Sequence, residues 1–263
     1  MKPTMRAMLG PFTKSAPMLV WLSGLLLAAP AYGVAQTAGL GTASSSEPLN
    51  LEWWHPFAAG AGVATLMLLD EPVRDLIQPA DDSLDGLADF AARFKDPEVF
   101  YISSAGAVLL GLATGDRKVT ATGVHIMAAY GLAGWMSIAT KWAFGRSRPS
   151  AVPSDATDFD WFGGGENSAF PSGSASVVFS LATTVADAVD RRPVSVLLYG
   201  GAALNSWARL HANRHWLSDV ATGALIGITA AKLVNGEWTV FGFRPPSLWT
   251  DGRSSSLGYS IEF

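Results

Sequence analysis

The chain has 263 residues, of which 49% are hydrophobic and 15% charged, with a formal net charge of −4 at pH 7. An acidic chain of this kind gives no reason to expect a nucleic-acid partner. Because an average soluble domain has roughly 25% charged residues, the composition leaves a heavily buried helical protein or a membrane protein. The chain has no cysteine, which excludes disulfides, thiolate catalysis and cysteine-based metal sites.

Residues 1–35 have the layout of a secretory signal peptide. Basic residues precede an apolar run at 18–29, and small residues follow it. A charged N-terminal region, a short apolar core and small residues at the cleavage site are typical of such peptides. The alternative is an uncleaved anchor helix, but the run is short for a span of about 20 residues. We therefore expect cleavage, and residues 36–52, rich in Gly, Ser, Thr and Ala, read as a flexible lead-in.

Residues 53–237 are expected to form one helical domain. Apolar runs predict a short amphipathic helix inside the acidic stretch 70–98, at 84–94. The longer predicted helices are at 53–69, 99–114, 119–144, 172–188, 193–210 and 215–234. This pattern indicates an all-α fold, a bundle of about six core helices.

Two segments depart from the helical pattern. Residues 145–169 are loop-like and rich in Pro and Gly, and a loop of this length inside a helical domain is usually functional. Residues 238–263 form a β-like tail, in which apolar residues alternate with polar ones at 257–263. We expect this strand to pair with 238–243 in a short C-terminal hairpin.

Three polar clusters stand at predicted helix boundaries, from Lys141 to Pro149, from Phe170 to Ser174 and from Arg209 to Asp219. The first and third supply the cations Lys141, Arg148 and Arg209. Arginine contacts phosphate oxygens at two points and lysine supplies a point charge. The second cluster, with Ser172, Gly173 and Ser174, opens a helix whose free N–H groups can bind the same oxygens.

His215 and Asp219 are four residues apart, so on a helix they share a face. The carboxylate can fix the tautomer of the ring and leave the other nitrogen free to attack. Each feature also has a structural explanation, since basic residues often complement helix dipoles and Pro-Ser-Gly is a common turn. Because all three clusters occur at predicted helix ends, we favour a shared phosphate site.

The clusters resemble the signature of the type 2 phosphatidic acid phosphatase superfamily, which includes bacterial class A acid phosphatases and vanadium haloperoxidases. The element Lys-x6-Arg-Pro is complete at Lys141, Arg148 and Pro149. The element Ser-Arg-x5-His-x3-Asp matches at Arg209, His215 and Asp219, with Ala208 in place of the serine. The resemblance extends over roughly residues 53–235 and implies an all-helical fold.

The resemblance also implies a phosphohistidine mechanism. In it His215 attacks phosphorus and Asp219 orients the ring. The phosphoryl oxygens would be bound by the side chains of Lys141, Arg148 and Arg209 and by the backbone of the Ser172–Gly173 turn. No metal or cofactor is implied, and vanadate would act as a phosphate mimic.

Ser174 departs from the family pattern, which has at this position the histidine that protonates the leaving group. A serine hydroxyl is a poor acid near neutral pH, and general acid catalysis is typically worth 10²–10⁴-fold. Substrates with good leaving groups would suffer least from this replacement. His211 lies near the site in sequence and is an alternative proton donor.

These residues predict a secreted phosphatase for phosphate monoesters or diphosphates, lipid phosphates included. The alternative is a catalytically impaired protein that binds a phosphate or lipid phosphate. For its location we expect the periplasm, reached through the signal peptide, with membrane association open. The alternative is a six-span inner-membrane protein whose site faces the periplasm, because the basic connections at 115–118 and 190–193 would then be cytoplasmic.

Overall fold

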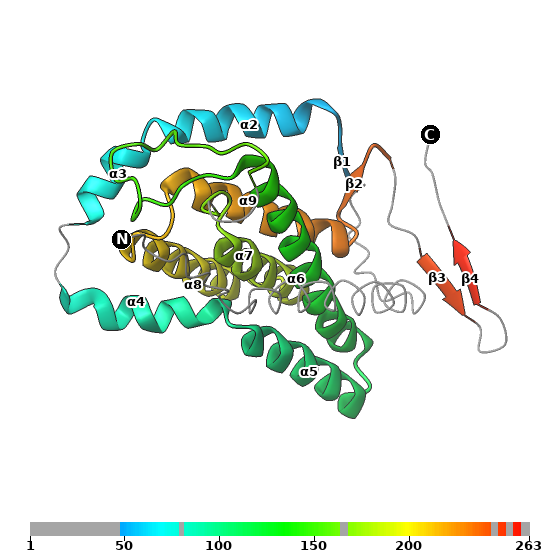
Figure 1. Cartoon of the computed structure of the whole chain (residues 1–263). Coiled ribbons are helices and arrows are strands. Elements are labelled where there is room, and N and C mark those ends of the chain that lie inside the picture. Colours follow the sequence, from blue (N-terminus) through cyan, green and yellow to red (C-terminus); the bar gives the residue numbers. More distant parts are fainter. Residues whose placement is uncertain (1–47, 79–81, 164–167, 243–246, 251–254, 259–263) are drawn as a thin grey trace, which may run out of the picture.

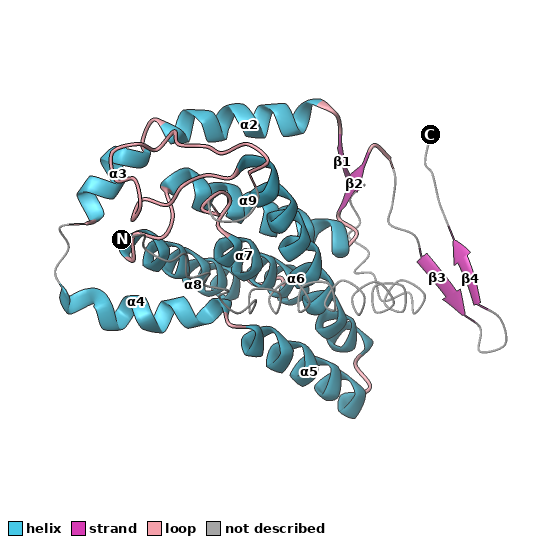
Figure 2. Cartoon of the chain, in the orientation of Figure 1, coloured by secondary structure: helices cyan, strands magenta, loops and turns pink. Residues whose placement is uncertain are grey.

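The computed structural model describes residues 48–78, 82–163, 168–242, 247–250 and 255–258. The predicted signal peptide and nearly all of the predicted lead-in lie outside these residues. The described chain is mainly helical, with short strands at the edge of a helical bundle (Figures 1 and 2). The all-α prediction is confirmed.

The helices match the predicted ones to within a few residues, with one addition. They are α2 (Trp54–Met67), α3 (Asp70–Ile77), α4 (Asp85–Ala92), α5 (Pro97–Thr114), α6 (Arg117–Phe144), α7 (Gly173–Val189), α8 (Arg192–His211) and α9 (Leu217–Val234). Single 3₁₀ turns, η1 (Asp82–Leu84) and η2 (Arg93–Lys95), flank α4. The sequence does not predict α3, because half of this short segment is charged and it contains a proline.

Local chemistry fixes where the core helices begin and end. The Asp116 carboxylate accepts from the backbone N–H groups of the first turn of α6, and the Ser172 hydroxyl caps α7 in the same way. Gly115 and Gly145 follow α5 and α6 with left-handed backbone conformations, which glycine adopts without a steric penalty. The long loop of the site therefore starts directly at the end of α6.

The central helix α7 packs against α6, α8 and α9. Its closest neighbour is α9, because two glycines of α9 face the backbone of α7. A Cβ atom at Gly223 would lie 2.4 Å from the carbonyl oxygen of Ser172, and one at Gly227 would lie 2.2 Å from that of Ser176. This close approach brings the N-terminal ends of α7 and α9 together.

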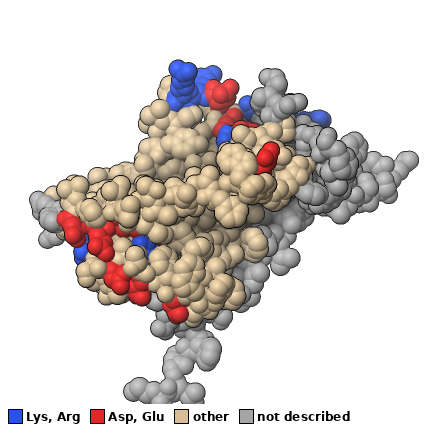
Figure 3. All heavy atoms as spheres, turned by 90° about the horizontal axis from the view of Figure 1, so that it is seen from above, with Lys and Arg blue, Asp and Glu red and all other residues tan. Residues whose placement is uncertain are grey.

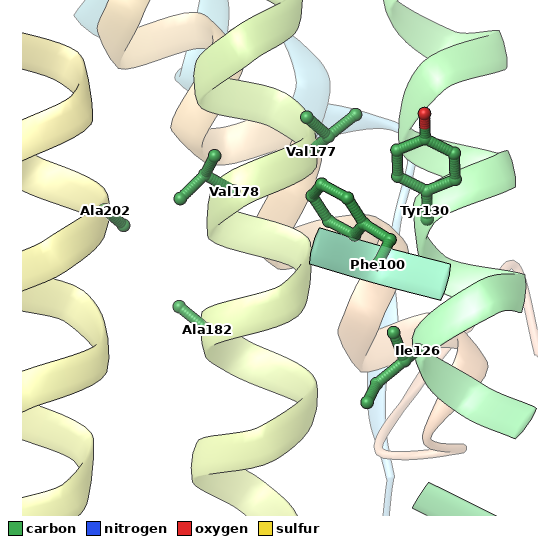
Figure 4. Packing of buried hydrophobic residues seen from close by; sticks show 7 residues of the cluster. All are labelled: Phe100, Ile126, Tyr130, Val177, Val178, Ala182 and Ala202. Atoms are coloured by element: carbon green, nitrogen blue, oxygen red, sulfur yellow. The ribbon is translucent and has the colours of Figure 1, made fainter. Parts of the chain in front are cut away.

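A buried apolar cluster joins α5, α6, α7 and α8 (Figure 4). Phe100 of α5 is fully buried, and its ring centroid lies 4.3 Å from that of Tyr130 on α6. Val177 of α7 lies beside Phe100, and Val178 points to the opposite side of α7, toward Ala202 of α8. The cluster anchors the start of α5 next to the start of α7.

The outer helices bury little of their apolar surface. Val63 is the one buried residue of α2, and Ile102 and Leu109 of α5 are 72% and 67% exposed. Among the described residues, α5 and α9 are long and apolar enough to cross a membrane, and 17% of α5 is buried against 50% of α9. Figure 3 shows the face over α2, where a broad area without charged side chains lies between charged groups.

The strands differ from the predicted hairpin. Strand β2 (Trp238–Val240) pairs in parallel with β1 (Leu49–Leu51), not with the end of the chain. It follows α9 directly and lies beside the segment that leads into α2 (Figure 1). A C-terminal hairpin does exist, between β3 (Ser247–Thr250) and β4 (Ser255–Gly258). The predicted pairing of 238–243 is therefore wrong, because a closer partner exists at the same end of the bundle.

Candidate active site

A cavity of about 310 Å³ lies at the end of the bundle where α6 and α8 finish and α7 begins. It brings together the residues that the three motifs single out. Its lining includes Lys141, Arg148, Gly173, Ser174, Arg209 and His215. Residues from η2 and the start of α5, Lys95, Asp96 and Pro97, complete one side.

His215 is buried, and the hydrogen bond of its ring decides which nitrogen can react. Nδ1 lies 2.8 Å from the carbonyl oxygen of Ala169, which can only accept. The neutral ring therefore carries its proton on Nδ1, and Nε2 keeps a free electron pair. Burial lowers the pKa of His215 to about 4; the nearby Asp219 carboxylate opposes this shift, and the charge of Lys141 adds to it. The ring is thus neutral and nucleophilic at physiological pH.

Asp219 does not take the Nδ1 proton as the sequence pattern suggests. Its Oδ2 lies 3.6 Å from Nδ1 of His215, beyond normal hydrogen-bond length. The same oxygen accepts from the backbone N–H of Trp216 at 2.7 Å. Asp219 therefore holds the turn that carries His215, and stabilises the ring indirectly.

Arg146, which the motifs do not include, is the centre of a fully buried ionic network. Its Nη1 donates to Oδ1 of Asp219 at 2.7 Å, and its Nη2 donates to Oδ2 of Asp70 at 2.7 Å. Further donations reach the hydroxyl of Ser218 and the carbonyl oxygen of Ala156. All five N–H groups of the guanidinium have acceptors, so this arginine positions other groups and has no donor left for a ligand.

Asp70, at the start of α3, is the second group in this network that the sequence does not reveal. It accepts from the backbone N–H of Ser218 at 2.8 Å and from its hydroxyl at 2.6 Å. It thereby anchors the first turn of α9 to α3. One cation facing two carboxylates leaves the network with a formal charge of −1, in a place where neither carboxylate is exposed.

The predicted phosphate cradle consists of Lys141, Arg148 and Arg209, which still have free donors. Lys141 donates from Nζ to the carbonyl oxygens of Ser168 and Pro171, so one of its three N–H groups remains for a ligand. Arg148 donates from Nη2 to the hydroxyl of Ser168 at 3.1 Å. The Nε atoms of Arg148 and Arg209 are buried and have no acceptor among the described residues. Unpaired buried donors are costly, and an anion in the cavity would reduce that cost.

The residues of the Pro-Ser-Gly-Ser turn have different positions relative to the cavity. Ser172 is fully buried and acts as the cap of α7, and it does not line the cavity. Gly173 lies beside Lys141, whose Cε would be 3.7 Å from a Cβ at this position. Ser174 lines the cavity, so it faces the same space as His215.

His211, the alternative proton donor, points elsewhere. Its Nε2 lies 2.8 Å from Oδ1 of Asp85, and its ring stacks on Trp207. It is absent from the residues that line the cavity. No sequence signal marks Lys95, Asp96 or Tyr130 as part of the site, whereas Arg146 could have been noticed as an additional cation inside the first motif.

Comparisons with known proteins match the part of the chain that carries the three motifs. Residues 122–240 match the PAP2 superfamily, a span that contains all three motifs. The lipid A 1-phosphatase of Porphyromonas gingivalis (strain ATCC 33277) is 35% identical over 109 residues, which are 41% of this chain and 21% of the relative. The match thus spans about a fifth of the length of that curated relative.

Two crystal structures are similar in fold. Aquifex aeolicus LpxE superposes with a TM-score of 0.50 over 63% of this chain and 94% of its own, at 23% identity. The first transmembrane PAP2 type phosphatidylglycerolphosphate phosphatase from Bacillus subtilis gives a TM-score of 0.45 over 84% of this chain and 95% of its own, at 17% identity. The match over residues 122–240, together with the motifs that meet in one cavity, places this part of the chain in the PAP2 superfamily.

Proposed function

We propose that this chain is a membrane-associated phosphatase that hydrolyses a phosphorylated lipid through a phosphohistidine intermediate, without a metal. One observation carries the proposal. The neutral Nε2 of His215 faces a cavity that is also lined by Lys141, Arg148 and Arg209. A buried nucleophile surrounded by cations favours an incoming phosphoryl group over other electrophiles.

In the first step Nε2 of His215 attacks phosphorus, and the bond to the leaving oxygen breaks. The free donors of Lys141, Arg148 and Arg209 hold the non-bridging oxygens, whose charge is spread in the transition state. As Nε2 becomes bonded, the ring acquires positive charge, which Asp219 stabilises from 3.6 Å. Water then attacks phosphorus and the electron pair of the P–N bond returns to Nε2.

Membrane association is supported by the apolar surface of the outer helices. The exposed faces of α2 and α5 would cost free energy in water at about 25 cal/mol per Å² of apolar surface. The curated relative is a lipid A 1-phosphatase, which acts on a phosphate of a lipid by its name. We therefore favour a membrane-associated protein over a free periplasmic domain.

The orientation follows from the basic connections. Arg117 and Lys118 start α6, and Arg191 and Arg192 lie where α8 starts, both at the end of the bundle opposite the cavity. Short loops with Lys and Arg are retained on the cytoplasmic side. The cavity would then open toward the periplasm.

Ser174 favours a second candidate function, a binding protein that keeps the phosphate cradle and lacks turnover. It lines the cavity at the position where the family signature has its acid. Without a proton donor, an alkoxide leaving group would depart slowly and the bound state would persist. This candidate predicts the same ligand with no product.

The test uses purified full-length protein in detergent, with a chelator and an activated aryl phosphate. We expect phosphate release in wild type, none in His215→Ala, and an acid-labile, alkali-stable phosphoryl group on the wild-type chain after rapid quenching. Equal release from His215→Ala would refute the assigned nucleophile. Tight vanadate binding without any release would favour the binding protein.

A further inference from the structure

We propose that Lys95 is the catalytic proton donor of this site, in place of the histidine that the family signature has where this chain has Ser174. Lys95 lies outside the three motifs, so no sequence pattern assigns it a role. The inference rests on the proposed phosphatase function, because it assigns one step of that reaction. It comes from the proton donors that line the cavity and from the sides of the cavity on which they lie.

The cavity contains two groups that are stronger acids than the hydroxyl of Ser174, the ammonium groups of Lys95 and Lys141. An alkoxide leaving group is comparable in basicity to hydroxide, whose conjugate acid has a pKa of about 15.7. An amine is a much weaker base than an alkoxide, so proton transfer from an ammonium group to the leaving oxygen is favourable. His211 is not available for this step, because its ring is bonded to Asp85 and does not line the cavity.

The other protic side chains that line the cavity are less suitable. The Asp96 carboxylate forms an ion pair with Lys95 and so has no proton to give. Ser168 offers only a hydroxyl. Tyr130 lies three turns before Lys141 on α6, about 16 Å along the axis at 1.5 Å per residue, so its phenol lies deeper in the bundle than the cradle. The two lysines therefore remain as candidates.

Lys141 is on the same side of the cavity as the nucleophile. Its Nζ donates to the carbonyl oxygens of Ser168 and Pro171. Nδ1 of His215 donates to the carbonyl oxygen of Ala169, in the same short segment. In phosphoryl transfer the attacking and leaving atoms lie roughly in line, on opposite sides of phosphorus. A cation beside the nucleophile is therefore placed to hold a non-bridging oxygen, and not to protonate the leaving one.

Lys95 comes to the cavity from the other side. It ends the 3₁₀ turn η2, which connects α4 to α5 and contacts α7 and α8. Figure 1 shows α4 and α5 on one side of the bundle and α9, which begins two residues after His215, on the other. Both Lys95 and His215 line the same cavity. They therefore lie on opposite sides of the space that a phosphoryl group would fill, as an in-line reaction requires.

Asp96 holds the ammonium group of Lys95 at the cavity wall. It is the N-cap residue of α5, but its side chain makes no capping hydrogen bond. Its carboxylate instead accepts from Nζ of Lys95 at 3.0 Å. This bond uses one of the three N–H groups, so others can face the leaving oxygen and water. The side chains of Lys95 and Asp96 are 35% and 41% exposed, so solvent can return a proton to the amine.

The reaction balances with Lys95 as acid and then as base. Nε2 of His215 attacks phosphorus, the bond from phosphorus to the alcohol oxygen breaks, and the electron pair stays on this oxygen. The oxygen takes a proton from Nζ of Lys95, so the alcohol leaves neutral and Lys95 becomes an amine. Water then attacks phosphorus and gives a proton to this amine, while the electron pair of the P–N bond returns to Nε2. Both side chains end in their starting forms.

The experiment compares two phosphate monoesters of similar size, 4-nitrophenyl phosphate and benzyl phosphate, by initial phosphate release from purified protein in one detergent. The nitrophenolate leaves as a stable anion, whereas benzyl alcohol has to leave with a proton. Lys95→Ala should lower kcat for benzyl phosphate by roughly 10²–10⁴-fold, the range that a general acid supplies, and kcat for 4-nitrophenyl phosphate by less than about tenfold. Arg93→Ala, an exposed cation of the same turn that does not line the cavity, is the matched control and should change neither rate.

Lys95→Arg separates proton transfer from charge. Arginine keeps the positive charge and the hydrogen-bond donors, but in proteins it does not give up its proton. Lys95→Arg should therefore lose the benzyl rate as Lys95→Ala does and keep the nitrophenyl rate. In the Lys95→Ala background, Ser174→His should restore part of the benzyl rate, because an imidazole can donate the missing proton. Thermal unfolding checks that each variant is folded.

The outcomes distinguish the role of Lys95 from the function on which it rests. The assignment would be overturned by equal losses on both esters in Lys95→Ala, by an unchanged benzyl rate in Lys95→Ala or Lys95→Arg, or by a wild type that hydrolyses only the nitrophenyl ester. In each of these cases the phosphatase function stands. Folded wild-type protein that binds vanadate and releases phosphate from neither ester would reject both.

Discussion

Replacing Arg146 with methionine should destabilise the fold more than any change in the phosphate cradle. The substitution keeps an unbranched side chain of similar length but removes the cation between Asp70 and Asp219, which are both fully buried. Removing one partner of a buried ion pair typically costs 3–5 kcal/mol, because the remaining charge has no compensation. Here two carboxylates lose their partner, so about 3–5 kcal/mol is a lower bound.

The assay is thermal unfolding of the purified protein in detergent, followed by the fluorescence of its 10 tryptophans. For a domain of this size each kcal/mol lowers Tm by roughly 2–4 °C, so Arg146→Met should lower it by roughly 6–20 °C. Arg74→Met is the matched control. Its ion-pair partner Asp75 is 69% exposed, such a pair is worth about 1 kcal/mol or less, and its other bond, from Nε to Oδ1 of Asn213, is long at 3.3 Å.

A further variant separates charge from packing. Adding Asp70→Asn to Arg146→Met removes one of the two orphaned charges and should recover part of the lost stability. If Arg146→Met unfolds within about 3 °C of Arg74→Met, the loss is below roughly 1.5 kcal/mol and the buried network is not the stabilising element described above.

Four further measurements address the site, its protonation and its orientation. Arg148→Ala and Arg209→Ala should each weaken vanadate binding 10- to 100-fold in calorimetry, as expected for a lost charge-assisted contact, and Arg117→Ala at the opposite end should leave it unchanged; uniform affinities would count against a shared cradle. Because burial lowers the pKa of His215 to about 4, its nitrogen NMR signals should show a neutral ring down to pH 5, and a midpoint near 6.5 would contradict the buried geometry. Since the unfolded chain takes up this proton first, the stability that His215 contributes above pH 6.5 should be lost as the pH falls toward 4. In the cysteine-free chain, a membrane-impermeant maleimide should label Ser154→Cys in intact cells with a permeabilised outer membrane and Arg117→Cys only after lysis; the reverse would invert the proposed topology.

The sequence predicts most helices because each is an apolar run with recognisable ends. Asp116 and Ser172 cap α6 and α7, and Gly115 ends α5 at the position where the pattern stops. Helix α3 escapes prediction because its role depends on Asp70, whose burial is decided by Arg146 and Ser218 and not by its neighbours in sequence. Because Asp70 is followed by further charged residues, the sequence pattern predicts a solvent-exposed segment at this position.

For the site, too, the sequence predicts which residues meet but not all of their contacts. Motif spacing predicts that His215, Lys141, Arg148 and Arg209 face one ligand, and all four line one cavity. Spacing alone suggests that Asp219 accepts the hydrogen bond of the His215 ring, but the acceptor is the backbone carbonyl oxygen of Ala169. Because every residue has a backbone carbonyl, no sequence pattern can identify this acceptor. Long-range backbone contacts of this kind depend on the packed loop and become visible only in three dimensions.

The network around Arg146 also sets the order in which the protein can mature. Its members come from positions 70, 146 and 218–219, so the last of them leaves the ribosome only with the start of α9. Until then the arginine and Asp70 have no complete set of partners, and the turn that carries His215 has no anchor. Nascent chains arrested before residue 217 should therefore be sensitive to added protease in the loop at 145–163, and chains arrested beyond α9 should resist it. If both lengths resist equally, this end of the bundle assembles before synthesis is complete; otherwise His215 lacks its anchor until α9 has been made.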